Sequence, residues 1–143
     1  MGHEDRGHYA RKHPGLQIDP AIAQEIKAAA KQGQLFCASA HRLAKVLGQT
    51  PAQIGIQTDL MELCIAHCQL GLFGYFPDKK KINPKVNVSK ALELTIFNTQ
   101  KNSRLSCRQC WDIAKAHGIS KLAMGSACEK LDIRIKPCQL GAF

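Results

Sequence analysis

Residues 43–55 read LAKVLGQTPAQIG, and residues 113–125 read IAKAHGISKLAMG. These two stretches lie at the centre of a longer repeat, because residues 19–73 align with residues 89–143 without a gap. Fifteen of the fifty-five aligned pairs are identical, whereas ordinary residue frequencies would give roughly three or four. An internal duplication therefore organises the chain.

Each copy predicts the same order of elements: helix, strand, helix, turn, helix and strand. In copy one, Asp19 is a good N-cap and Pro20 suits the first helical position. Ile22 and Ile26 give this helix one apolar face. The later elements are a short strand (34–37 or 104–107), a helix (39–48 or 109–118), a turn, a helix (about 51–62 or 121–131) and a closing strand (62–68 or 132–138). The predicted fold class is mostly α with short β strands.

Both copies end on the same phrase, CQLGLF at 68–73 and CQLGAF at 138–143. Gly71 and Gly141 permit a turn after the closing strand, and the neighbouring leucine and phenylalanine fold back onto a core. We therefore interpret each phrase as the closing segment of its own module. The predicted organisation is a lead-in segment (1–18), a first module (19–73), a lysine-rich linker (74–88) and a second module (89–143).

The chain is basic, and the charge is concentrated in its second half. It has 143 residues, 45% of them hydrophobic, and a formal net charge of +9. Residues 1–73 hold seven Lys/Arg and six Asp/Glu, whereas residues 74–143 hold thirteen and five. Such a balance predicts an anionic partner, with nucleic acid the first candidate. No run of 18 apolar residues exists, so we expect no membrane span and a cytoplasmic protein.

The two central stretches resemble the helix-turn-helix motif in its winged-helix form. Three aligned positions carry the resemblance: a small residue where two helices cross (Ala44 and Ala114), a glycine four residues later (Gly48 and Gly118), and an apolar residue six beyond it (Ile54 and Met124). The chain departs from the pattern where His117 replaces Leu47. The resemblance implies tandem winged-helix-like modules.

Winged-helix proteins usually place the second helix of the motif in the major groove and touch the backbone with a strand-turn-strand wing. The resemblance therefore implies that this chain is a regulator that binds double-stranded DNA. The expected contacts, chosen for their basic, hydroxyl or amide side chains, are Lys121, Ser126, Lys130, Arg134, Lys136, Arg108, Gln53, Gln57, Lys79, Lys80 and Lys81. Arg104 and Lys115 add to the basic surface of copy two.

The equivalent helix of copy one has no basic residue and carries Asp59, with Glu62 just beyond it. Acids repel phosphate, so we predict that the first module packs or binds a protein partner. An alternative function follows for the whole chain: an interaction adaptor that does not bind DNA.

The seven cysteines contain two spacings typical of metal ligands, Cys64-x3-Cys68 and Cys107-x2-Cys110. Four thiolates can hold zinc or an iron–sulfur cluster. Thiols packed as small apolar groups are the competing interpretation, because Cys64 and Cys110 have no cysteine at the matched positions. Arginines at 104 and 108 and a predicted helix start favour the thiolate of Cys107. A thiol-rich metal or redox-sensing protein acting through protein contacts is therefore a rival prediction.

The sequence offers little for an enzyme. It contains no glycine-rich phosphate loop, no nucleotide-binding fingerprint and no paired acids in a helical metal motif. Its cysteines and histidines are not set in a motif for a nucleophile and its base. We therefore expect no enzymatic activity and, apart from the metal alternative, no cofactor.

Overall fold

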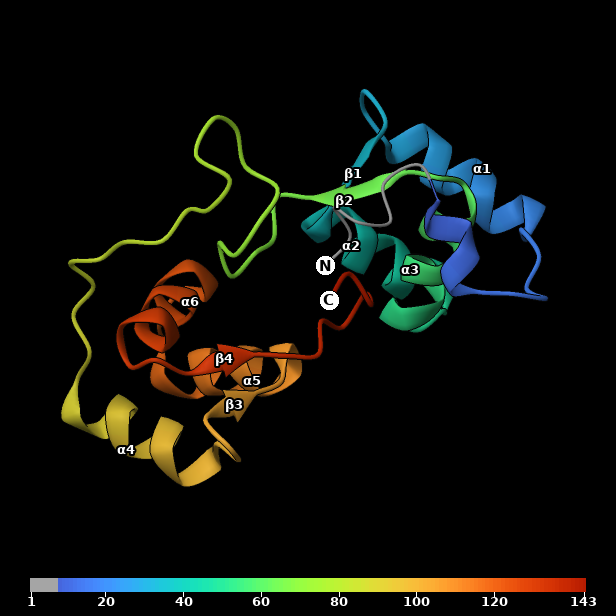
Figure 1. The fold of residues 1–143 in the computed structure, drawn as a ribbon. Coiled ribbons are helices and arrows are strands. Elements are labelled where there is room, and N and C mark those ends of the chain that lie inside the picture. The colour runs from blue at the N-terminus through green and yellow to red at the C-terminus, as the bar shows by residue number, and fades with distance from the viewer. Residues whose placement is uncertain (1–7) are drawn as a thin grey trace. The chain divides into compact units, whose positions relative to one another are not determined.

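The computed structural model describes residues 8–143, and most of their regular structure is helical. The chain forms two compact units (Figure 1). Unit 1 comprises Met1–Cys68 together with Gln139–Phe143, and unit 2 comprises Gln69–Cys138. The first seven residues of the predicted lead-in segment lie outside the described residues. Within residues 8–143, the structure contains no helix with the length and apolar character needed to cross a bilayer.

Unit 1 follows the element order predicted for copy one. Its elements are the 3-10 helix η1 (Tyr9–Lys12), α1 (Pro20–Ala29), β1 (Gln34–Phe36), α2 (Cys37–Leu47), α3 (Pro51–Leu60) and β2 (Cys64–Ala66). The strands β1 and β2 pair in parallel, with Leu35 opposite Ile65. Parallel strands cannot be joined by a short hairpin turn, and here the helix pair α2–α3 forms the longer connection between β1 and β2.

Unit 2 repeats this order without a 3-10 helix among its described elements. Its elements are α4 (Lys90–Thr99), β3 (Arg104–Leu105), α5 (Cys107–His117), α6 (Lys121–Lys130) and β4 (Arg134–Ile135). The strands β3 and β4 are also parallel, with Leu105 opposite Ile135. The predicted mostly helical class with short strands is confirmed in both units.

Local sequence signals explain where the helices begin and end. The Asp19 side chain accepts hydrogen bonds from two backbone N–H groups in the first turn of α1. Thr50 forms a reciprocal capping box at the start of α3, and Ser120 caps α6. Gly48 and Gly118 end α2 and α5 with φ of 64° and 65°, a left-handed conformation that glycine adopts without strain.

Equivalent positions form the two cores. Residues from the first helix, the first strand and the third helix of each unit are almost fully buried: Ile26, Leu35 and Ile54 in unit 1, and Ile96, Leu105 and Met124 in unit 2. Cys37 and Cys107, which start α2 and α5, are also buried. These thiols occupy the place of small apolar side chains.

The strand pairing differs from what the winged-helix resemblance implies. A wing is a strand-turn-strand hairpin of consecutive antiparallel strands, whereas β1–β2 and β3–β4 are parallel pairs with two helices between their members. The closing strand of each copy therefore pairs with the strand that precedes the two helices.

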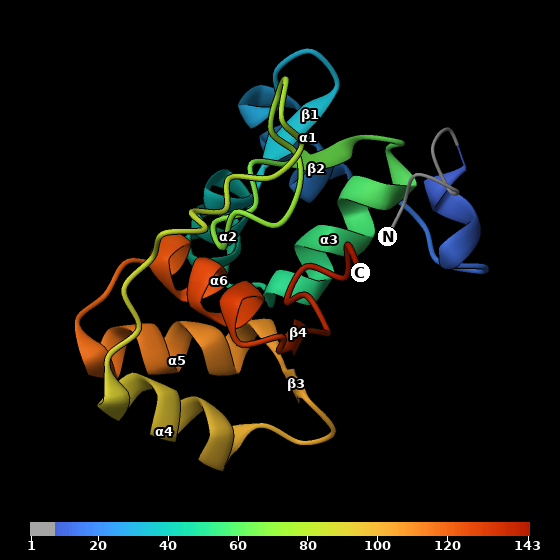
Figure 2. The ribbon, with the colours of Figure 1, turned by 60° about the vertical axis from the view of Figure 1, so that its left-hand side comes forward.

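The repeated CQLG phrases also differ from the prediction, because neither closes its own copy. Residues 139–143 belong to unit 1, and residues 69–73 belong to unit 2. Figures 1 and 2 both show the red end of the chain beside α3. The units thus depart from the repeat boundaries by an exchange of equivalent segments. The predicted linker, residues 74–88, lies within unit 2.

Candidate nucleic-acid interface

One face of the β3–β4 sheet carries basic side chains. Arg104 and Arg134 are register partners, and both are exposed. Side chains alternate between the two faces of a strand, so Lys136 lies on the same face as Arg134. The Lys136 N–H donates to the carbonyl oxygen of Leu105 at 2.7 Å, which holds this residue against β3. We call Arg104, Arg134 and Lys136 the basic sheet face.

The opposite face of this sheet is apolar. Leu105 is 1% exposed, and Ile133, two residues before Ile135 on the same side, is buried. Burial of this face orients the sheet, because a shift of one residue in register would bury the arginines. The core of unit 2 therefore determines which way the basic side chains point.

The basic sheet face has no neutralising acid within the described residues. Neither arginine nor Lys136 forms an ion pair with any Asp or Glu among residues 8–143. Like charges directly opposite each other on neighbouring strands destabilise a sheet. Such a surface attracts an anion, because the anion removes the repulsion between the two guanidinium groups.

The equivalent positions of unit 1 are neutral, and two of them, Cys64 and Ala66, are partly or fully buried. Gln34 and Cys64 are the register partners that match Arg104 and Arg134, and Ala66 matches Lys136. Unit 1 instead stacks Phe36 on His67, with ring centroids 4.0 Å apart and an interplanar angle of 6°. Three cationic positions thus distinguish two sheets of the same topology.

Three of the other basic residues predicted on copy two have partners within unit 2, and Lys115 is exposed. Lys121 lies over the ring of Trp111, with its ammonium 4.4 Å from the ring centroid. The Lys130 ammonium donates to the carbonyl oxygen of Val86 at 3.1 Å. Arg108 is exposed and pairs with Asp112 at 3.5 Å, a surface contact of small energy.

Ser126 lies inside unit 2 rather than on its surface. Its side chain is 2% exposed, and its hydroxyl accepts a hydrogen bond from the Asn83 N–H at 2.8 Å. The predicted linker therefore packs against α6, the helix expected to enter the groove. In this conformation Ser126 is not available to DNA.

The corresponding helix of unit 1 is covered in a similar way. Gln57 accepts from the Asp19 N–H at 2.8 Å and donates to the Gln17 carbonyl at 3.3 Å. Gln53 is exposed, and its side chain forms the capping box with Thr50. Both predicted base-reading amides thus have structural roles in α3.

The three predicted linker lysines, residues 79–81, are exposed. Lys80 pairs with Glu129 at 3.5 Å, and the Lys81 ammonium lies 5.8 Å from the ring centroid of Tyr75. Their contacts are with unit 2 itself. They add positive potential to this unit, and Lys85 contributes one more exposed cation.

The predicted metal ligands are divided between the units. Cys64 and Cys68 belong to unit 1, whereas Cys107 and Cys110 belong to unit 2. Residues 8–143 contain no group of three or more His, Cys, Asp or Glu side chains arranged to hold a metal ion. All seven cysteines lie in this range, five of them buried and two, Cys64 and Cys138, partly exposed. The zinc or cluster alternative stays a prediction, which metal analysis of anaerobically purified protein would test.

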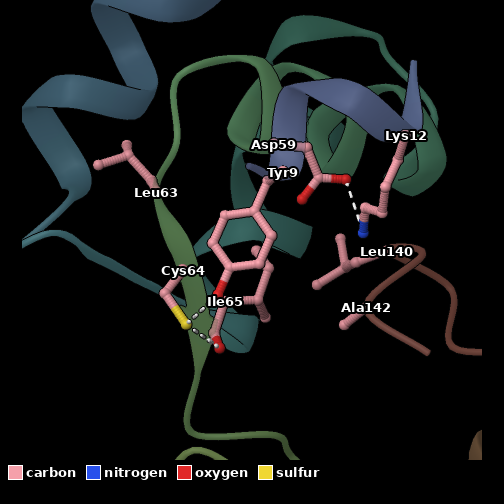
Figure 3. Close-up of a pocket in the computed structure, with 8 residues that line it drawn as sticks. All are labelled: Tyr9, Lys12, Asp59, Leu63, Cys64, Ile65, Leu140 and Ala142. Atoms are coloured by element: carbon pink, nitrogen blue, oxygen red, sulfur yellow. Dashed lines mark hydrogen bonds and ion pairs between the residues drawn. The ribbon is translucent and has the colours of Figure 1, made fainter. Parts of the chain in front are cut away.

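Unit 1 has a small cavity beside Cys64, lined by residues of several segments (Figure 3). The Tyr9 hydroxyl donates to the Cys64 sulfur at 3.6 Å, and Lys12 pairs with Asp59 at 3.0 Å. The cavity volume is about 20 Å³, which is room for about one water molecule. This cavity joins η1, β2 and the second QLG segment, and it is too small for a ligand.

Sequence reasoning assigned the main contacts to the second helix of the motif, and it missed that the linker covers this helix. The alternation of basic and apolar residues in RLS and RIK was the available signal for a charged strand face. No sequence signal specified which strand would lie beside which. The chain matches no family model, and neither a curated protein nor a solved structure is significantly similar to it.

Proposed function

We propose that the chain is a small regulator that binds double-stranded DNA through the basic sheet face of unit 2. The observation that carries this proposal is the register pairing of Arg104 with Arg134, both exposed and without an acidic partner among residues 8–143. Unit 1, with the same topology, has neutral residues at both positions. The positive charge is therefore a property of this surface and not of the fold.

The chemistry of the face suits a phosphate backbone. A guanidinium group donates two parallel hydrogen bonds to phosphate oxygens, and Lys136 adds a third cation on the same side. Contacts of this kind position a protein on the duplex without reading its sequence. The exposed linker lysines strengthen the field that attracts the polyanion.

In this proposal α6 supports the binding surface and does not read bases. Ser126 is buried, and Lys130 is held by the carbonyl oxygen of Val86. A groove-inserting role for α6 would require residues 83–86 to leave it. Binding through the sheet face requires no such rearrangement.

The test is a salt titration of binding to a short DNA duplex. The variant replaces the three cations by neutral residues: Arg104→Gln, Arg134→Gln and Lys136→Ala. Each phosphate contact contributes about 0.9 to the slope of log K against log salt, so we expect a slope smaller by about 2.7. Fluorescence anisotropy of a labelled duplex gives affinity and slope together.

The matched control removes three exposed cations from unit 1: Lys27→Gln, Lys31→Gln and Lys45→Gln. Both variants lose the same net charge, so a general effect of charge would alter them equally. We expect the slope of the control to stay close to that of the wild type. Equal losses in the two variants, or a wild type without salt-sensitive DNA retention, would overturn the proposal.

A protein partner for unit 1 is a second candidate, supported by a groove on its surface. The groove has a volume of about 240 Å³ and is lined by α1, β1 and α2 residues that include Ala28, Phe36 and Ser39. A photocrosslinker at Ser39, compared with and without Ala28→Arg, tests this role. We expect the crosslink to a protein partner to be lost in the Ala28→Arg variant, while DNA binding persists.

A further inference from the structure

The third helix of each unit has a glycine in its interior that faces the exchanged QLG segment. A Cβ atom on Gly55 would overlap the carbonyl oxygen of Leu140, and one on Gly125 would overlap that of Leu70. Glycine is otherwise unfavourable inside a helix. The close approach of another backbone explains its presence at both matched positions.

The leucine of each segment is the apolar anchor of this contact. Leu140 is 2% exposed in unit 1, and Leu70 is 0% exposed in unit 2. Figure 3 shows Leu140 beside Ala142 in the small cavity with Ile65. We call the surface of α3 around Gly55 the α3 groove.

A polar contact accompanies the leucine in each unit. The Lys12 ammonium donates to the Gly141 carbonyl oxygen at 3.4 Å, and the Lys81 N–H donates to the Gly71 carbonyl oxygen at 2.8 Å. In both cases the donor lies in the segment that precedes the first α-helix of the unit. The two units therefore hold equivalent carbonyl groups, one through a side-chain ammonium and the other through a backbone N–H.

Each unit takes the QLG segment that follows the closing strand of the other unit. Unit 1 takes the segment of copy two, and unit 2 takes that of copy one. This reciprocity is the relation between two subunits that exchange a segment. Residues 139–143 join unit 2 at Cys138, and the residues just before it, Lys136 and Pro137, are exposed.

We propose that the α3 groove of unit 1 also binds residues 139–143 of a second copy of this chain, so that two copies form a segment-exchanged dimer. The contacts made by the incoming segment are those seen within one chain. Only the course of the chain near Cys138 changes. Tethering gives the chain's own segment an effective concentration in the millimolar range, so exchange in the wild type requires a high protein concentration.

Complementation of two variants tests this proposal without competition from the acceptor chain's own segment. The donor carries Gly55→Val, which closes its own groove and leaves its segment intact. The acceptor lacks residues 139–143, which leaves its groove open. Each alone is expected to be a monomer, and their mixture is expected to give a one-to-one complex by light scattering after size exclusion.

The control adds Leu140→Asp to the donor, which removes the apolar anchor and should abolish the complex. A mixture of donor and acceptor in which both remain monomeric would overturn the proposal, provided the acceptor keeps native circular dichroism. If the acceptor does not fold, a second experiment decides.

The second experiment uses the full chain with a photocrosslinking residue at position 142. Two differently tagged forms are mixed at concentrations up to about 1 mM, the range of the tethered segment, and irradiated. Crosslinks that join the two tags and increase with concentration support exchange. Crosslinks confined to single chains at every concentration would overturn it.

Discussion

Units 1 and 2 share a buried framework and differ on their surfaces. Leu35 and Leu105 are both buried in parallel strand pairs, yet the residues next to them are Gln34 in one unit and Arg104 in the other. The hydrophobic face of each strand must fit the core, whereas Gln34, Arg104 and Arg134 are exposed and do not have to fit it. One framework can therefore carry a neutral surface and a basic surface.

The third helices give a second comparison, because each is covered by the segment that precedes its unit's first helix. Lys12 pairs with Asp59 at 3.0 Å in unit 1, and Lys80 pairs with Glu129 at 3.5 Å in unit 2. In unit 1 the carboxylate of Glu62 also accepts the N–H groups of Tyr9 and Ala10. Asp59 in α3 and Glu62 just beyond it therefore bind residues of η1, which agrees with the prediction that the acids give the first module a packing role.

The largest predicted effect concerns the exchanged leucines. Leu140→Ala and Leu70→Ala should each lower the free energy of unfolding by about 2–5 kcal/mol, because each removes a buried side chain. Hydrogen exchange should show the loss crosswise: in α3 of unit 1 for Leu140→Ala, and in α6 of unit 2 for Leu70→Ala.

The exposed residue Val46, replaced by alanine, is the control for the leucine variants, and we expect little change. Faster exchange in α6 rather than α3 for Leu140→Ala would show that each segment closes its own copy after all.

The helical glycines should give an effect of similar size. Gly55→Val and Gly125→Val force the exchanged backbone away from the helix, so the buried leucine leaves its site as well, and each should lower the free energy of unfolding by about 2–5 kcal/mol. Chemical denaturation measures this loss. Ala52→Val, at an exposed position of α3, controls for the helix propensity of valine. Equal stability of Gly55→Val and Ala52→Val would contradict the close approach seen in the structure.

A smaller loss of stability, in Ser126→Ala, tests whether α6 supports the binding surface or reads bases itself. Ser126→Ala removes the acceptor for the Asn83 N–H and should cost about 1 kcal/mol of stability. DNA affinity should be unchanged, because the hydroxyl lies inside unit 2. Ser39→Ala in unit 1 is the control for loss of a hydroxyl. A loss of DNA affinity without a loss of stability would instead indicate that α6 enters the major groove of DNA.

The smallest effect comes from the arginine pair itself. Arg104→Gln relieves the repulsion from Arg134 and should raise the free energy of unfolding by a few tenths of a kcal/mol. High salt screens exposed charges, so the gain should disappear there. Lys31→Gln, near the neutral sheet of unit 1, should give no such gain. A destabilised Arg104→Gln would show that Arg104 has a favourable partner.

Much of the local structure followed from short stretches of sequence. Asp19 caps α1 as predicted, and Thr50 and Ser120 cap α3 and α6 while Gly48 and Gly118 end α2 and α5. These features depend on contacts within a few residues, which the spacing alone describes. The repeat then predicted that both copies share one element order.

The tertiary structure alone determined which strands pair and which unit each QLG segment packs against. An alternating strand pattern defines a buried face but not the neighbouring strand, so the parallel pairs β1–β2 and β3–β4 could not be derived from it. The two CQLG phrases are identical in their first four residues, so neither phrase by itself indicates which unit it packs against. Only contacts between distant segments distinguish the two arrangements, and the structure places Leu140 against Gly55 and Leu70 against Gly125.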